Sequence, residues 1–543
     1  MLGLMQNRPL LISSLIQHAE TFHGGVEIVS RSVEGPVHRT DWRSVARHSR
    51  QLANALAALE LSEAASVATL AWNTWRHLEV YYGVSGSGKV LHTVNPRLSL
   101  EQLTYIINHA EDQVLFFDIS FADLIMQLAP ALTTVRHYVA MTDRAHMPQL
   151  DLPGLACYEE LIQAQDDDYA WPSFDENTAS SLCYTSGTTG NPKGVLYSHR
   201  STVLHAMATC AMDGMALGAQ TSLLLVVPMF HVNGWGAPYS SAMAGAKLVL
   251  PGPRMDGENL YGLLGEERVT FALGVPTVWL MLLQYLDQHP ELDRKGLALQ
   301  GVAVGGSALP RVVIDRFERE LGAQAVQLWG MTETSPLGVS NLHLLPAQEH
   351  LPPEQQMPYR LKQGRGLWGV QLKIVDDQGQ ALPWDGQRAG HLMVRGPWIA
   401  ARYYKSEQGL LDDEGYFPTG DIATVDPDGY VQLVDRAKDV IKSGGEWISS
   451  IELENVAVSH PGVGEAAVIG VAHPKWQERP LLLAVRNASG ATLSPEELLA
   501  YMEQRVPKWW LPDEVVFVES LPHTATGKLL KSRLREQYKG SAG

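Results

Sequence analysis

Residues 184–194 (YTSGTTGNPKG) constrain this chain more than any other stretch. They combine hydroxyl side chains, glycines, a proline and Lys193 in one short loop that follows an apolar segment. Glycines let the backbone turn so that successive N–H groups face one concavity, hydroxyls add donors, and the lysine adds a mobile cation. The run therefore predicts a loop that holds phosphate.

The loop does not fit the Walker A pattern. Counted from Gly187, Pro192 stands where that pattern needs its second glycine, and Gly194 stands where it needs a hydroxyl. Residues 195–197 indicate a strand, so the loop is expected to join two strands, with Ser198 capping the helix that follows. Taken alone, such a cluster is equally compatible with an ordinary hairpin turn.

Length and charge limit the class of protein. With 543 residues the chain exceeds what one hydrophobic core supports, so about two to four domains are expected. Its 42 basic and 59 acidic residues give a net charge of −17, which opposes nonspecific binding to nucleic acid or to an anionic membrane. Sparse cysteines and the absence of signal-peptide and membrane-spanning patterns predict a cytoplasmic protein without integral membrane association.

Strands and helices alternate along most of the chain. Strand candidates at 65–72 and 89–94 flank a helix candidate at 77–86, and the same rhythm runs from 221 to 329, which predicts parallel α/β sheets. From residue 369 short strands separated by Gly, Asp and Pro turns indicate a barrel-like β subdomain. After residue 435 a small α+β unit is expected.

Further polar motifs follow predicted strands or turns. They are FHVNGW (230–235), GGSA (305–308), WGMTE (329–333), TGD (419–421), DRAKDVIKSGGE (435–446) and TGK (526–528). Loops at the ends of parallel strands are where α/β proteins gather their binding sites. Each motif also has an ordinary reading by itself: a core histidine at His231, a helix-start turn at Gly305, and solvated turns or tails around Lys438 and Lys528.

Together, these motifs in this order resemble the adenylate-forming superfamily, which comprises acyl-CoA synthetases, luciferases and peptide-synthetase adenylation domains. The resemblance covers nearly the whole chain and departs from the family pattern at Trp329, where tyrosine is more usual. It implies an α/β fold with a large N-terminal domain of parallel-rich sheets, including a β-rich subdomain at about 365–435, and a small mobile C-terminal domain. The expected boundary divides residues 1–435 from 436–543.

The resemblance also implies roles for the motif residues. Lys528, His231, Glu333 and Thr185 are expected to be catalytic, and Thr185 and Glu333 to hold Mg²⁺. Trp329 is expected to stack on adenine and Asp421 to hold the ribose hydroxyls. The full set of expected nucleotide-binding residues is Thr185, Ser186, Gly187, Thr188, Thr189, Gly190, Lys193, Gly306, Ser307, Ala308, Trp329, Gly330, Met331, Thr332, Asp421, Arg436 and Lys528.

The remaining expected roles concern the acid, the thiol and the hinge. The acyl pocket is assigned to His231, Trp235, Gly305, Gly330 and Pro336. The hinge is placed at Lys438, and the coenzyme A tunnel is assigned to Lys442, Gly444, Gly445 and Trp447. The implied substrates are a small carboxylic acid, ATP with Mg²⁺, and coenzyme A, and a homodimer is expected.

The activity implied is that of an acid–thiol ligase, which makes an acyl adenylate and then a coenzyme A thioester. Residues 229–235 and 444–454 are similar to bacterial medium-chain fatty acid ligases and to 3-methylmercaptopropionate–CoA ligases. Three alternatives stay open: an adenylation enzyme that loads a carrier protein, a luciferase-like oxygenase, and a nonenzymatic adenylate sensor. Retention of both Glu333 and Lys528 counts against the sensor.

Overall fold

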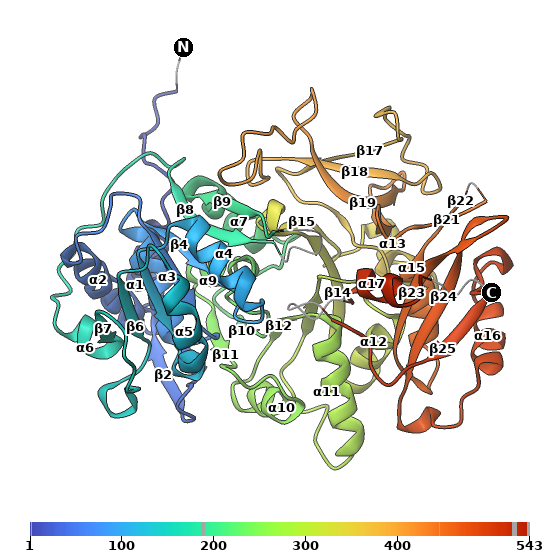
Figure 1. Cartoon of the computed structure of the whole chain (residues 1–543), viewed down its shortest axis with the longest axis horizontal. Coiled ribbons are helices and arrows are strands. Elements are labelled where there is room, and N and C mark those ends of the chain that lie inside the picture. Colours follow the sequence, from blue (N-terminus) through green and yellow to red (C-terminus); the bar gives the residue numbers. More distant parts are fainter. Residues whose placement is uncertain (2, 186–190, 445, 524–528, 540–543) are drawn as a thin grey trace.

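Two large, mostly parallel sheets form the N-terminal part of the chain (Figure 1). The computed structural model describes residues 1, 3–185, 191–444, 446–523 and 529–539. Within those residues, the first sheet has seven strands, which are parallel except at β9. In spatial order they are β7 (Leu155–Cys157), β6 (His137–Ala140), β5 (Val114–Phe117), β3 (Ser66–Leu70), β4 (Val90–Thr93), β8 (Ala179–Tyr184) and β9 (Gly194–Ser198).

The second sheet has nine strands in the described part of the chain and a parallel centre with antiparallel edges. In spatial order they are β16 (Arg365–Gly366), β15 (Leu337–Ser340), β14 (Gln324–Gly330), β13 (Gly301–Val304), β12 (Phe271–Gly274), β10 (Ser222–Leu225), β11 (Lys247–Leu250), β1 (Glu27–Arg31) and β2 (Val37–Asp41). The pairing of β1 with β11 brings the start of the chain into a sheet built from residues far along the sequence.

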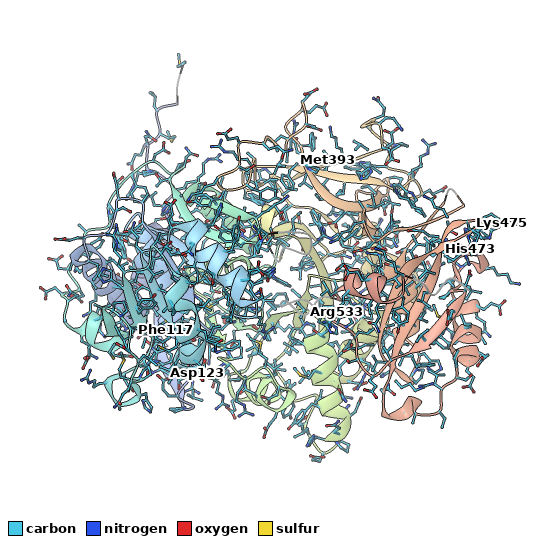
Figure 2. All side chains as sticks on the ribbon, in the orientation of Figure 1. Phe117, Asp123, Met393, His473, Lys475 and Arg533 are labelled. Atoms are coloured by element: carbon cyan, nitrogen blue, oxygen red, sulfur yellow. The ribbon has the colours of Figure 1, made fainter. Side chains whose placement is uncertain are left out.

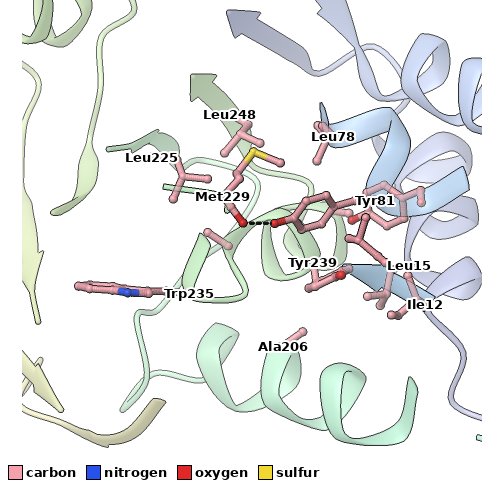
Figure 3. Packing of buried hydrophobic residues seen from close by; sticks show 14 of the residues in the cluster. Ile12, Leu15, Leu78, Tyr81, Ala206, Leu225, Met229, Trp235, Tyr239 and Leu248 are labelled. Atoms are coloured by element: carbon pink, nitrogen blue, oxygen red, sulfur yellow. Dashed lines mark hydrogen bonds between the residues drawn. The ribbon is translucent and has the colours of Figure 1, made fainter. Parts of the chain in front are cut away.

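Helices cover these sheets and fill the space between them. Those of the N-terminal part are α1 (Ile12–His23), α2 (Trp42–Ala58), α3 (Trp75–Gly86), α4 (Leu100–Ala110), α5 (Ala122–Leu128), α6 (Tyr158–Gln163), α7 (His199–Cys210), α8 (Val232–Trp235), α9 (Ala237–Ala244), α10 (Gly257–Glu266), α11 (Pro276–Gln288), α12 (Arg311–Arg316), α13 (Pro346–Glu349) and α14 (Pro353–Arg360). Figure 3 shows part of the shared core, where Tyr81 of α3 donates a hydrogen bond to the carbonyl oxygen of Met229 and packs beside Tyr239 of α9.

The C-terminal third contains two smaller sheets. An antiparallel sheet consists of β17 (Gln371–Val375), β18 (Gly390–Arg395), β19 (Phe417–Val425) and β20 (Val431–Arg436). The last sheet consists of β22 (Glu446–Ile448), β21 (Ile441–Ser443), β24 (Gln477–Arg486), β23 (Val463–His473) and β25 (Glu514–Phe517), and it packs with α15 (Ser450–Val458), α16 (Pro495–Glu503) and α17 (Lys531–Gln537). Figure 2 shows His473 and Lys475 at its outer end.

The alternating pattern of the sequence predicted the mixed α/β class, and this is confirmed. The phosphate-loop run was expected to join two strands, and it does lie between β8 and β9, which pair antiparallel. Ser198 caps α7 as expected, because its hydroxyl accepts the N–H of Ser201 at 3.0 Å. The short elements β1, β2, β6, β7, α5 and α6 were not predicted. The boundary at residue 435 stays a prediction.

Three buried histidines stabilise the N-terminal part in their neutral form. Burial lowers the pKa of His77 and of His199 to about 4, and that of His205 to about 3, from the ordinary value of 6.5. The Nε2 atom of His205 accepts the backbone N–H of Leu337 at 3.1 Å, which a doubly protonated ring cannot do. This bond joins α7, which follows β9 of the seven-stranded sheet, to β15 of the nine-stranded sheet.

We predict that His205→Gln loses stability against the wild type at neutral pH, and that the difference shrinks as the pH falls. Because the pKa of His205 is lower in the folded protein, its contribution to the free energy of unfolding is fully present above pH 6.5. That contribution is lost as the pH falls toward 3, by about 1.4 kcal/mol per pH unit. Urea unfolding midpoints at about pH 7.5 and about pH 5.5 measure this difference. The exposed His350→Gln is the control. An equal difference between His205→Gln and the wild type at both pH values would contradict the prediction.

Candidate active site

A cavity of about 500 Å³ lies where the carboxyl ends of several strands meet the C-terminal part of the chain. Residues following β10, β12, β13 and β14 line it, together with Thr185 and Lys193 at the junction of β8 and β9. Residues Arg436, Lys438, Asp439 and Leu529 complete the wall from the C-terminal side. Binding sites in open α/β sheets form at such strand ends.

The two ends of the phosphate-loop run are held together beside the cavity. The backbone N–H of Thr185 donates to the carbonyl oxygen of Lys193 at 2.9 Å, and the N–H of Lys193 donates to Oγ1 of Thr185 at 3.1 Å. These bonds continue the β8–β9 ladder to the edge of the loop. The predicted loop residues Ser186, Gly187, Thr188, Thr189 and Gly190 lie outside the described residues.

Glu333 lies in the cavity wall in a short turn after β14. It is only 5% exposed, and its Oε1 accepts the hydroxyl of Tyr403 at 2.6 Å. Burial and the neighbouring carboxylate raise the pKa of Tyr403, so the hydroxyl stays protonated and donates. The ammonium of Lys193 lies 4.8 Å from the centroid of the same ring. Tyr403 therefore contacts both the acidic and the basic residue that were expected to handle MgATP.

Trp329 and Asp421 are directly bonded. The indole N–H of Trp329 donates to Oδ2 of Asp421 at 2.9 Å, and Oδ1 of Asp421 pairs with Nε of Arg436 at 2.8 Å. Trp329 and Arg436 line the cavity, whereas Asp421 lies behind them. Each carboxylate oxygen keeps a further lone pair after these contacts, so Asp421 retains the capacity to accept hydroxyl donors.

The segment after β10 adopts a left-handed turn, labelled α8, which directs Trp235 into the cavity. The φ angles of Val232, Asn233, Gly234 and Trp235 are 45°, 51°, 59° and 57°. Residues other than glycine disfavour this left-handed conformation. The buried amide of Asn233 offsets this strain, because its Nδ2 donates to Ser181 at 2.8 Å and its Oδ1 accepts from Thr93 at 3.2 Å. Figure 3 shows Trp235 directed away from the Tyr81–Tyr239 core.

Trp235 packs against the backbone of Gly305. A Cβ atom on Gly305 would lie 2.8 Å from the indole, so only glycine allows this approach. Gly330 is similarly constrained, since a Cβ there would lie 2.0 Å from the carbonyl oxygen of Pro336. His231, which precedes the left-handed turn, lines the same space with Trp235 and Pro336. The residues expected to form the acyl pocket therefore lie together.

The cavity is lined by both apolar and charged side chains. The apolar lining includes Met215, Val226, Val227, Pro228, Met255, Val275, Val278, Leu328 and Leu337. The charged lining among the described residues has four cations, Arg97, Lys193, Arg436 and Lys438, against two anions, Glu333 and Asp439. Four minus two leaves an excess of two positive charges in a chain whose net charge is −17. This arrangement suits a ligand that has an anionic part and an apolar part.

Some expected site residues lie elsewhere. Gly306, Met331 and Thr332 line the cavity, whereas Ser307 and Ala308 do not. Lys442, Gly444 and Trp447 belong to the β21–β22 hairpin, where the N–H of Gly444 donates to the carbonyl of Trp476 at 2.9 Å. Gly445 and Lys528 lie outside the described residues, although Leu529, the next residue after Lys528, lines the cavity.

Sequence reasoning missed five polar residues of the described wall: Arg97, Asn191, Thr277, Tyr403 and Asp439. Asp439 lies inside the predicted hinge motif, shortly after β20, and Arg97 lies shortly after β4. Their positions after strand ends were therefore a signal that could have identified both. Tyr403 lies in an irregular loop after β18, where neither periodicity nor a motif identifies it.

Comparison with known proteins gives matches along nearly the whole chain. A family model described as AMP-binding enzyme matches residues 16–404, and one described as AMP-binding enzyme C-terminal domain matches residues 452–528. The chain is 52% identical to a 3-methylmercaptopropionyl-CoA ligase of Ruegeria lacuscaerulensis over 99% of both chains. It is 50% identical to a medium-chain-fatty-acid–CoA ligase of Ectopseudomonas oleovorans, covering 99% of this chain and 98% of the relative.

Solved structures share the fold. The anthranilate CoA ligase bound to anthranoyl-AMP aligns with a TM-score of 0.85 at 23% identity, covering 99% of both chains. ATP-bound MatB from Rhodopseudomonas palustris aligns with a TM-score of 0.81 at 24% identity, covering 98% of this chain and all of that one. In the described part of the chain, no helix combines the length and apolar character needed to cross a bilayer.

Proposed function

The chain belongs to the AMP-binding enzyme family, and from that premise we propose how its cavity activates a carboxylic acid. It is an AMP-forming acid–thiol ligase of the acyl-CoA synthetase type. The observation that carries the proposal is the single cavity lined by Lys193, Glu333 and Leu529, which lie in or directly after three distant motifs. Its charged lining residues suit ATP and its apolar lining residues suit the acyl group.

The first half-reaction joins the acid to the nucleotide. A carboxylate oxygen attacks the α-phosphorus of ATP, the bond from that phosphorus to the bridging oxygen breaks, and pyrophosphate leaves. Both reactants are anionic, so cations and backbone donors must reduce their repulsion. We assign this role to Lys193 and the adjacent loop, and to Lys528, whose neighbour Leu529 lines the cavity.

The second half-reaction makes the thioester. The sulfur of coenzyme A, after losing its proton, attacks the acyl carbon, the bond to the adenylate oxygen breaks, and AMP leaves. We propose that Lys438 serves as a hinge, and that Lys442, Gly444, Gly445 and Trp447 then reach the thiol path by rotation of the C-terminal domain. Their position on the β21–β22 hairpin, outside the cavity, is compatible with such a rotation.

Magnesium is proposed as the metal that accompanies ATP. Glu333 is a hard oxygen ligand in the cavity wall, and Thr185 supplies a hydroxyl nearby. The described residues contain no cluster of three or more His, Cys, Asp or Glu side chains that could hold a metal ion. Glu333 suits magnesium, which is usually held by one or two carboxylates together with substrate phosphates. When bound, the ion would reduce the charge on the phosphates.

The nucleoside half of ATP is assigned to the Trp329–Asp421 unit. Trp329 borders the cavity and would lie against adenine, while its N–H orients the carboxylate of Asp421 toward the ribose hydroxyls. Gly306, Ser307 and Ala308 would complete the adenine site. Arg436, bonded to Asp421, would contact the ribose or a phosphate.

The acid is proposed to be 3-methylmercaptopropionate or a short to medium-chain fatty acid. The names of the relatives at 52% and 50% identity support these acids, and so does the apolar lining with Met215 and Met255. Trp235 against Gly305 occupies space beside the acyl region in this conformation, which favours a slender chain over an aryl group.

A cytoplasmic homodimer is also proposed. Light scattering that gives the mass of one 59.7 kDa chain would contradict the dimer.

A panel of acids tests the function. We predict that 3-methylmercaptopropionate or a saturated acid of intermediate length has a kcat/KM at least about tenfold above that of benzoate and malonate. An apolar pocket changes kcat/KM by about tenfold or more for each methylene-sized group that a substrate gains or lacks. Mass spectrometry should detect the CoA thioester, and pyrophosphate release should match it without oxygen consumption. A product formed only on a carrier protein, or only with oxygen, would support one of the alternatives instead.

Lys528→Ala separates the half-reactions. We predict that it lowers adenylate formation by about two orders of magnitude or more, since its charge acts while pyrophosphate leaves, and spares thioester formation from supplied acyl adenylate. Single-turnover assays of each half-reaction measure these two effects. Lys531→Ala is unsuitable as a control because Lys531 is buried. The exposed Lys508→Ala serves instead. Equal loss in both half-reactions would refute the assignment of Lys528.

A further inference from the structure

The loop that contains Tyr403 is attached at both ends to parts of the active site. At its start, the N–H of Ala400 donates to the carbonyl oxygen of Glu333 at 2.8 Å. At its end, the N–H of Tyr404 donates to the carbonyl oxygen of Gly194 at 2.8 Å, next to Lys193. The loop therefore spans from the acidic residue of the cavity to the basic end of the phosphate-loop run.

A third attachment fixes the far side of this loop. The ammonium of Lys405 pairs with Glu111 at 2.5 Å and donates to the carbonyl oxygen of His109 at 2.9 Å. Because backbone bonds and an ion pair hold the segment on both sides, Tyr403 has a defined position between them.

Tyr403 makes different contacts through its hydroxyl and its ring. Its hydroxyl donates to Oε1 of Glu333 at 2.6 Å, and its ring faces the ammonium of Lys193, which lies 4.8 Å from the ring centroid. Within the part of the chain that the structure describes, Lys193 and Glu333 do not form an ion pair with each other, and Tyr403 lies between them.

This separation has a chemical consequence. An ammonium and a carboxylate that share a cavity attract each other, and attraction grows as the surroundings become less polar. A direct Lys193–Glu333 pair would engage the cation needed for phosphate and the carboxylate needed for the metal. A neutral hydroxyl donor and an aromatic face satisfy both charges more weakly than a full ion pair does, so ATP and its metal can displace them.

We propose that Tyr403 is a positioning residue that keeps Lys193 and Glu333 from pairing with each other and so keeps both available to the nucleotide and its metal. This inference rests on the proposed function, in which Lys193 faces phosphate and Glu333 faces magnesium. It also explains why a tyrosine in this position serves better than an aliphatic residue, which has neither the ring nor the hydroxyl and would leave both charges free to meet.

Equilibrium binding of ATP without magnesium tests the proposal, because that state uses Lys193 but not the metal role of Glu333. Tyr403→Leu should weaken ATP binding about tenfold, since the lysine becomes paired with Glu333. Adding Glu333→Gln to that variant removes the competing charge and should restore affinity to within about twofold of Glu333→Gln alone. A merely structural tyrosine would not give this rescue.

The matched control is Tyr416→Leu. Tyr416 also carries a lysine over its ring, with Lys373 at 4.4 Å, but it lies outside the described cavity lining. It should leave ATP affinity unchanged. A double variant that binds ATP as weakly as Tyr403→Leu, or a Tyr403→Leu variant that binds like the wild type, would overturn the proposal. Failure of the wild type itself to bind ATP would instead contradict the proposed function.

Tyr403→Phe provides a second test that preserves the ring and its packing. It should bind ATP without magnesium within about twofold of the wild type, because the ring still faces Lys193. The magnesium concentration that half-maximally tightens ATP binding should shift by about threefold or more, because Glu333 loses its hydroxyl partner. An unchanged magnesium midpoint would show that the hydroxyl does not position Glu333.

Discussion

Local collection of positive charge is the constraint on which the active site depends. A chain with a net charge of −17 must bind an anionic nucleotide and an anionic acid in one place. The fold does this by bringing basic residues from distant segments, such as Lys193 and Arg436, to the carboxyl ends of parallel strands. Partial removal from water strengthens the interaction of these cations with phosphate, but it also strengthens their attraction to the buried Glu333. Tyr403 contacts both Glu333, through its hydroxyl, and Lys193, through its ring.

The junction between the two parts of the chain contains a second set of charges that is almost fully buried. Asp435, at the end of the β20 ladder, accepts the N–H of Ser450 at 2.9 Å across the proposed hinge. Behind it, Lys531 pairs with Glu454 at 2.7 Å, and burial raises the pKa of Glu454 to about 7. Rotation about Lys438 would break the bonds of Asp435 while leaving the Lys531–Glu454 pair within the C-terminal part. The present arrangement, with Leu529 in the cavity wall, is therefore held by specific contacts.

Much of this site was predictable because its chemistry is concentrated in short motifs at strand ends. Lys193, His231, Trp235, Gly305 and Glu333 were expected from the sequence and do lie around one cavity. Tyr403 was not, because its position depends on loop contacts to Glu333 and Gly194 that no periodicity encodes. The bond between Trp329 and Asp421 joins residues 92 positions apart, and the pairing of β1 with β11 spans an even longer separation. Such contacts follow from tertiary packing, which local patterns leave undetermined.

The route of the carboxylate oxygen tests the central claim most directly. In adenylate chemistry one oxygen of the acid becomes bonded to the α-phosphorus and stays with AMP when the thiol displaces it. With acid labelled by oxygen-18 in its carboxylate, mass spectrometry of the products should find one labelled oxygen in AMP and none in pyrophosphate. Labelled inorganic phosphate, or AMP without label, would contradict an acyl-adenylate intermediate in this cavity.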